Sequence, residues 1–259
     1  MRLAKQYVSL QHSHRGTILA LFMGILLVLG GCAGEDADDA SKSDSEPASD
    51  LAALNSEYAT TPYETDYADV HRIDLPTGAS IAPHEGGPRV IYSINAYTMR
   101  LETDGSTSER AFEAGEVHYH AGGVHAVHLP ENLGDETASF LAFERTGPLP
   151  AAPSSDGETL DAVSIPDGVT HEVLLENDDF TTHRIMLEPG ASIPPHYGFS
   201  RIVYSLSAYT LTFVDPDDSD TRTEQSFSEG DLHDHEAGMH AVENTGDQRA
   251  EYLVVAFRQ

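Results

Sequence analysis

The chain has 259 residues and is strongly acidic, with 43 Asp and Glu against 14 Lys and Arg and a formal net charge of -29 at pH 7. Such a surface repels phosphate backbones, so nucleic acid is excluded as an expected partner. The single cysteine, Cys32, rules out intrachain disulfides and metal sites built from several thiolates.

Residues 1–31 have the pattern of a secretory signal peptide, with a basic start at Arg2 and Lys5 and an uncharged, mostly apolar stretch from 17 to 29. This stretch is too short to span a bilayer, which takes about 20 residues. The sequence Leu-Gly-Gly-Cys that ends at Cys32 resembles the lipobox of bacterial lipoproteins. The resemblance implies that Cys32 becomes the lipidated first residue of the mature chain. The alternative is an ordinary secretory signal in which Cys32 has no role.

Residues 32–55 are rich in Asp, Glu, Ser and Ala and poor in large apolar side chains, which predicts a flexible acidic tether. Ala33 follows Cys32, where the inner-membrane retention signal of enterobacteria has aspartate. We therefore expect a lipid-anchored protein of the cell envelope, at the outer membrane or the cell surface rather than the inner membrane. The expected partners are this membrane, a small-molecule ligand and a second copy of the chain.

The rest of the chain contains one segment twice, residues 70–101 and 182–213, with 17 of 32 aligned positions identical. A second matched block begins at Gly115 and again at Gly230. These repeats predict two domains, residues 56–146 and 161–259, joined by a Pro- and Ser-rich linker over 147–160.

Within each half, short β-branched and aromatic runs are separated by Pro, Gly and Asp. Strands are predicted over three matched pairs of segments: 71–75 and 183–187, 89–94 and 201–206, 96–101 and 208–213. The pattern predicts an all-β fold, either a small barrel or a double-sheet jelly roll.

Two motifs in each half resemble those of the cupin family. The first motif, a glycine followed six residues later by histidine, is matched at Gly78–His84 and Gly190–His196. The second, another glycine and histidine, is matched at Gly115–His125 and Gly230–His240. The resemblance covers nearly the whole body and implies two tandem cupin barrels, each a double-stranded β-helix or jelly roll. The segment that begins at His171 also resembles small cupins of the β-alanine degradation type.

Histidine is the residue type that the two halves share most strongly. Ten of the twelve histidines that follow Cys32 fall into matched pairs: His71 and His183, His84 and His196, His118 and His233, His120 and His235, His125 and His240. Imidazole is the commonest nitrogen ligand for first-row metals. The cupin resemblance implies that His84 and His125, and likewise His196 and His240, point into a barrel and bind a metal.

Both halves lack the other two ligands of the cupin pattern. Gly86 and Gly198 stand where a second histidine is expected, and Arg89 and Arg201 stand where an acid is expected. A guanidinium is permanently charged and cannot ligate a metal. The departure leaves two hypotheses about the pocket.

One hypothesis is a rearranged four-nitrogen metal site in each barrel, for Zn, Fe, Ni, Cu or Mn. Its ligands are His84, His118, His120 and His125 in the first half and His196, His233, His235 and His240 in the second. The alternation of side chains along a strand puts His118 and His120 on one face. The alternative is that this face is the outer one.

The other hypothesis is a pocket without metal, in which Arg89 or Arg201, near Tyr92 or Tyr204, holds a carboxylate. Its alternative is a structural ion pair with a nearby acid. The sequence thus predicts an envelope-anchored cupin lipoprotein that binds a divalent metal, or else a non-catalytic module for a small anion. If the protein is an enzyme, the expected chemistry is that of a metal-dependent oxygenase or hydrolase acting on a small organic acid.

Overall fold

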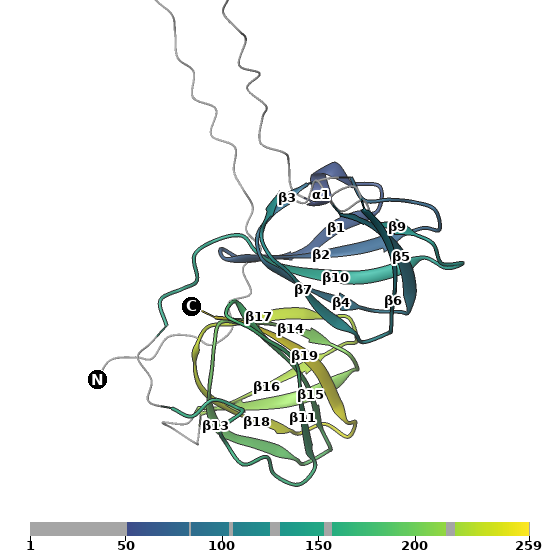
Figure 1. Ribbon diagram of the computed structural model, residues 1–259. Coiled ribbons are helices and arrows are strands. Elements are labelled where there is room, and N and C mark those ends of the chain that lie inside the picture. The colour runs from purple at the N-terminus through teal and green to yellow at the C-terminus, as the bar shows by residue number, and fades with distance from the viewer. Residues whose placement is uncertain are drawn as a thin grey trace, which may run out of the picture. The chain divides into compact units, whose positions relative to one another are not determined.

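The computed structural model describes residues 51–82, 84–103, 106–124, 130–152, 157–215 and 221–258 (Figure 1). The predicted signal peptide, Cys32 and His125 lie outside these residues. The described chain is nearly all β, as predicted: one short helix, α1 (Leu51–Leu54), precedes two successive sets of antiparallel strands. Within the described ranges, no helix has the length and apolar character needed to cross a membrane.

The first set of strands forms a barrel, called here the first barrel. Its main sheet has the order β1-β2-β10-β4-β7, with bounds β1 (Ala59–Glu64), β2 (Ala68–Leu75), β10 (Ala138–Arg145), β4 (Arg89–Ser93) and β7 (Val117–His120). The remaining strands are β5 (Tyr97–Thr103), β6 (Ser106–Phe112) and β9 (Glu131–Asn132), which pair in the order β6-β5-β9, and β3 (Glu85–Gly86) with β8 (Gly123–Val124).

The second barrel repeats this order. Its main sheet is β11-β12-β19-β14-β17, with bounds β11 (Val169–Glu176), β12 (Phe180–Leu187), β19 (Ala250–Phe257), β14 (Arg201–Ser205) and β17 (Leu232–His235). Its other sheet is β13-β18-β15-β16, with bounds β13 (Ser192–Gly198), β18 (Gly238–Asn244), β15 (Tyr209–Val214) and β16 (Arg222–Phe227).

The two main sheets contribute to one apolar cluster, called here the shared core. The first barrel contributes Tyr67, Val70, Val90, Leu141 and Phe143, and the second contributes Phe180, Ile202, Leu253, Val255 and Phe257. Most of these side chains are fully buried. The central strands β10 and β19 are therefore buried on both faces, one facing a barrel interior and the other facing the shared core. This explains why both read as nearly continuous apolar runs rather than as alternating ones.

Hydrogen bonds link the two barrels at the edge of the shared core. The Tyr63 hydroxyl donates to Asp234 Oδ1 at 2.5 Å, and the Tyr119 hydroxyl donates to Asp179 Oδ2 at 2.6 Å. Each tyrosine crosses from the first barrel to an acid of the second. Both contacts satisfy a polar group at the margin of an otherwise apolar interface.

Two segments that the sequence assigns to connections belong to the barrels instead. Residues 51–55, the end of the predicted tether, form α1 and the turn after it, and Leu51 is buried in the first barrel's core. The end of the predicted linker joins the second barrel, because Leu160 is buried in its core and Thr159 bridges Tyr197. In each case two leucines in a polar stretch gave too weak a signal, and the burial of Leu51 and Leu160 depends on the barrel wall beside them.

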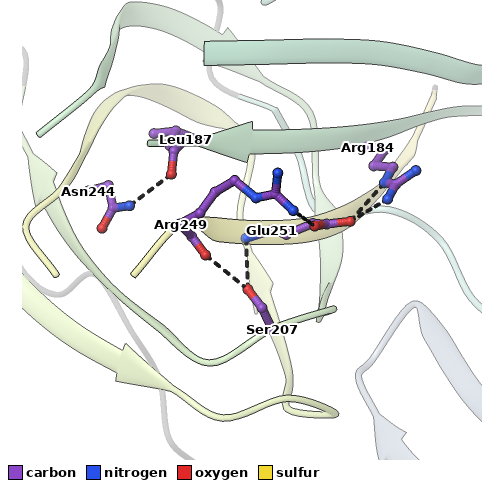
Figure 2. Close-up of polar contacts among 6 residues, drawn as sticks. All are labelled: Arg184, Leu187, Ser207, Asn244, Arg249 and Glu251. Atoms are coloured by element: carbon purple, nitrogen blue, oxygen red, sulfur yellow. Dashed lines mark hydrogen bonds and ion pairs between the residues drawn. The ribbon is translucent and has the colours of Figure 1, made fainter. Parts of the chain in front are cut away.

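Polar contacts that Figure 2 shows link strands of the second barrel. Glu251 accepts from Arg184 at 2.5 Å and from Arg249 at 3.0 Å, and the Asn244 amide donates to the Leu187 carbonyl at 2.9 Å. Asn132 makes the equivalent bond to Leu75 in the first barrel at 2.8 Å. Both asparagines are fully buried, so the turn that follows each second motif is anchored in the same way in both halves.

Phe257→Ala is expected to lower the free energy of unfolding by about 3–5 kcal/mol, because it removes a buried ring from the shared core. Urea denaturation followed by circular dichroism measures the change. Ile165→Ala, at a side chain that is 38% exposed, serves as the control and should shift stability by about 0.5 kcal/mol or less. Equal effects of the two substitutions would contradict the importance of the shared core.

Candidate functional site

Each barrel has a cavity whose wall includes several histidines. The first cavity has a volume of about 400 Å³, and His84, Arg89, His118 and His120 lie in its wall. The second has a volume of about 80 Å³, and its wall includes Arg201 and five histidines: His183, His196, His233, His235 and His240. The histidine rings of β7 and β17 thus face the cavities. Strand alternation alone left open whether they face inward or outward.

The hydrogen bonds of the first-motif histidines fix which ring nitrogen carries the proton. His84 Nδ1 lies 3.0 Å from the Ala82 carbonyl oxygen, and His196 Nδ1 lies 2.9 Å from that of Pro194. Because a carbonyl can only accept, Nδ1 is the protonated nitrogen in both rings. Nε2 therefore carries the lone pair, as a metal ligand requires.

In the second barrel, Arg201 contacts His240, the histidine of the second cupin-like motif. Its Nη2 donates to His240 Nε2 at 3.1 Å, and its Nη1 donates to the Phe199 carbonyl at 3.1 Å. A guanidinium has only donors, so the lone pair on His240 Nε2 is already used. The geometry therefore opposes a metal bound by His196 and His240 together.

Gly198 is the residue that makes room for this guanidinium. A Cβ at position 198 would lie 2.4 Å from Arg201 Nη1 and 2.8 Å from His240 Cε1. In the first barrel, a Cβ on Gly86 would lie 2.8 Å from Glu144 Oε1. The glycine and the arginine thus depart from the cupin pattern together. The arginine and its partners fill the space that a side chain at the glycine position would occupy.

In the first barrel the arginine has an acidic partner. Arg89 Nη1 donates to Glu144 Oε2 at 3.0 Å, and both side chains are buried. Glu144 Oε1 also accepts from the Gly87 backbone N–H at 2.8 Å. The structural ion pair that the sequence analysis left open is therefore present in this barrel.

Tyr92 and Tyr204 do not accompany the arginines in the cavities. Both lie in or against the shared core, where their ring centroids are 6.1 Å apart. Along β4, Arg89 and Ile91 face the cavity, so Val90 and Tyr92 face the other way. The same alternation on β14 separates Tyr204 from Arg201. Matched residues in both halves marked these tyrosines in the sequence, but their role is in the contact between barrels.

Sequence analysis missed a cluster at one end of the second cavity, formed by Asp161, His171 and His183. His171 Nε2 lies 2.7 Å from His183 Nδ1 and 3.6 Å from Asp161 Oδ1. All three ligand atoms lie within 4.8 Å of one another, and they can hold a metal ion. The strand register puts Ala59 at the position in the first half that corresponds to His171, and there Thr61 contacts His71, the counterpart of His183, at 3.0 Å. A histidine of the second half without a matching histidine in the first was the available signal.

Among the residues that the structure describes, this is the group in which three ligand atoms come within 4.8 Å of one another. The sets predicted from sequence share a cavity without such convergence. In the second barrel, the ring centroids of His233 and His235 are 5.1 Å apart, and those of His196 and His240 are 4.1 Å apart. In the first barrel, those of His118 and His120 are 5.1 Å apart. The four-nitrogen sites stay a prediction, and His125 lies outside the described residues.

Burial keeps the cavity histidines neutral. Desolvation lowers the pKa of His196 and of His233 to about 4, and nearby Arg201 adds to the shift in both. Desolvation, followed by repulsion from Arg110, lowers the pKa of His118 to about 4. Desolvation and repulsion from His171 lower the pKa of His183 to about 4. Neutral imidazoles are the form that binds metals, so these rings are ready to do so at neutral pH.

Comparison with solved structures identifies the architecture. Oxalate decarboxylase from Bacillus subtilis at pH 4.6 matches with a TM-score of 0.54 and 17% identity, over 77% of this chain and 71% of that one. Another oxalate decarboxylase structure, which concerns a structural element that modulates proton-coupled electron transfer, matches with a TM-score of 0.55 and 17% identity, over 77% and 72%. The match spans both barrels. This chain has the bicupin fold.

A third structure, a cupin 2 conserved barrel domain protein from Leptotrichia buccalis, has a TM-score of 0.47 and 12% identity, over 77% of this chain and 88% of that one. No protein-family model matches the chain, and no curated protein sequence does so either. At these identities the likeness of the bicupin neighbours concerns the fold alone. The local geometry of each cavity therefore carries the functional argument.

The bicupin should lose stability as the pH falls from 7 to 5. Between pH 6.5 and 4, the unfolded chain binds a proton on His118 and His233 that the folded chain does not bind. The free energy of unfolding that these two neutral histidines contribute is thus complete above pH 6.5 and is lost as the pH falls towards 4. His233→Phe, which keeps the ring stacked on Phe227, should show a smaller fall in the urea midpoint over this range. An unchanged fall in this variant would contradict the assignment.

Proposed function

We propose that the protein is a metal-binding bicupin whose second barrel holds one divalent metal through Asp161, His171 and His183. The observation that carries the proposal is the 2.7 Å separation of His171 Nε2 and His183 Nδ1, with Asp161 Oδ1 beside them. The two imidazole nitrogens share one N–H hydrogen bond, and a metal ion bound to both would displace that proton as the two rings move slightly apart. Two imidazoles and one carboxylate suit Zn²⁺, Fe²⁺ and Mn²⁺.

The electrostatics of the second cavity favour this site over the usual cupin position. Arg201 brings a positive charge to His240 and occupies its Nε2 lone pair. Asp161 brings a negative charge to His171 and His183 instead. A cation is therefore attracted by Asp161 and repelled by Arg201.

The site has the access that a functional metal requires. The Asp161 side chain is 45% exposed, while the His183 ring lies in the cavity wall and is almost fully buried. The three residues leave a coordination position for water or a ligand, which is typical of catalytic rather than structural sites. A bound divalent ion supplies Lewis-acid chemistry there. One of the bicupin structures similar to this chain, with a TM-score of 0.52 and 16% identity, concerns the Mn(II) centres of oxalate decarboxylase, which supports a divalent metal here.

Metal titration of the chelator-treated protein tests the site. With Zn²⁺ or Mn²⁺, calorimetry should give about one equivalent per chain, and His171→Ala should weaken binding at least tenfold because it removes one of three ligands. His71→Ala is the matched control, because His71 is the counterpart of His183 in the first barrel and contacts Thr61 rather than a histidine.

His196→Ala separates the proposed site from the usual cupin position. It should leave the affinity unchanged if Asp161, His171 and His183 hold the ion. Loss of binding in His196→Ala with full binding in His171→Ala would place the metal at the family position and contradict the proposal. Circular dichroism establishes that each variant is folded.

We further propose that the protein is attached to the cell envelope through a lipid on Cys32. The support is the apolar stretch over 17–29, the Leu-Gly-Gly-Cys sequence and the acidic tether that follows. The full-length protein expressed in a bacterium should partition into a detergent phase and incorporate a labelled fatty acid. Cys32→Ser should move it to the aqueous phase without label, and equal partitioning of the two forms would contradict the proposal.

A further inference from the structure

We infer that the second barrel binds a small carboxylate at Arg201, in the place that the Glu144 carboxylate occupies in the first barrel. This binding goes beyond the proposed metal function and does not depend on it. The inference comes from comparing the same position in two barrels with the same strand order.

The strand register shows which residues correspond. In the first barrel, Arg89 on β4 pairs directly with Glu144 on β10, and Glu144 pairs with Asp69 on β2. In the second barrel, Arg201 on β14 pairs with Ala256 on β19, and Ala256 pairs with Thr181 on β12. The arginine is kept in both rows, whereas the two acids of the first barrel give way to alanine and threonine in the second.

Arg201 is therefore a buried cation with no carboxylate in direct contact among the described residues, and Asp234 acts on its charge only from beyond 4.0 Å. Its side chain is 7% exposed, and no carboxylate among the described residues lies within 4.0 Å of it. Its partners are the Phe199 and Glu236 carbonyls and the neutral ring of His240. Burial lowers the pKa of Arg201 to about 10, so it stays charged at neutral pH. A buried charge without a contacting counterion is costly, and an anion from solution that contacts Arg201 lowers that cost.

The first barrel shows which anion the arrangement accepts. There the Glu144 carboxylate receives hydrogen bonds from Arg89 at 3.0 Å and from the Gly87 N–H at 2.8 Å. The chain thus supplies its own carboxylate to Arg89. Ala256 removes this carboxylate from the second barrel but leaves the arginine in the same register, which opens the position to a carboxylate that comes from outside.

The size of the second cavity limits this ligand to a few heavy atoms. Its volume of about 80 Å³ corresponds to about three waters, since each water takes about 30 Å³ in the liquid. Val203 and Val254 line the wall beside Arg201, so the part of the ligand next to them is apolar. Formate, acetate and similarly small organic acids fit this description.

The test is a titration of the chelator-treated protein with acetate, followed by calorimetry and by the rise in melting temperature. The intact protein should bind acetate saturably, and Ala256→Glu should weaken binding at least tenfold, because it restores the internal carboxylate. Arg201→Gln should do the same. Arg184→Gln is the control, because Arg184 is an exposed arginine paired with Glu251, and it should bind like the unaltered protein.

Glu144→Ala gives the reciprocal test in the first barrel. It leaves Arg89 without its carboxylate, and acetate should then stabilise this variant more than it stabilises the unaltered protein. Absence of saturable acetate binding to the intact protein, or unchanged binding in Ala256→Glu, would overturn the inference. Chloride that stabilises as much as acetate would also overturn it, because a carboxylate site prefers a two-oxygen acceptor. The titrations lack metal, so their failure is separate from failure of the metal site.

Discussion

The shared core between the two main sheets is the constraint on which the rest of the structure depends. Each of β4, β10, β14 and β19 is covered on both faces, so every side chain on these strands has one of two places to go. One set enters the shared core and the alternate set enters a cavity. A shift of one residue would exchange the two sets, sending Arg201 into the apolar interface and Ile202 into the cavity.

This constraint explains why two kinds of matched residue have different roles. Tyr92 and Tyr204 are kept in both halves because they pack where the barrels meet. The arginines and histidines are kept because they face the interiors. The strand arrangement that the two barrels share therefore fixes where each matched side chain lies. The chemistry of each barrel depends on the few positions at which the halves differ.

Two such differences lie in the second barrel and concern opposite charges. His171 replaces the contact that Thr61 makes in the first barrel and brings a second imidazole to His183, beside Asp161. Ala256 replaces Glu144 and leaves Arg201 without a contacting acid among the described residues. The wall of one cavity thus carries Asp161, which favours a cation, and Arg201, which favours an anion. A small carboxylate at Arg201 would lie in the same cavity as His183, one of the proposed metal ligands.

The sequence by itself determined the all-β fold, the duplication, the matched histidines as a group and the arginine at the lost ligand position. These features depend on local strand patterns and on motifs that recur within the chain. Only the tertiary structure decided which residues meet. Asp161 precedes β11, His171 lies on β11 and His183 lies on β12. His183 becomes the neighbour of His171 only when β12 pairs with β11. Glu144 and Arg89 are 55 positions apart, and their ion pair depends on the register of β10 with β4. Strand patterns show which side chains share a face, whereas the tertiary structure decides which face is inside and which residues become neighbours.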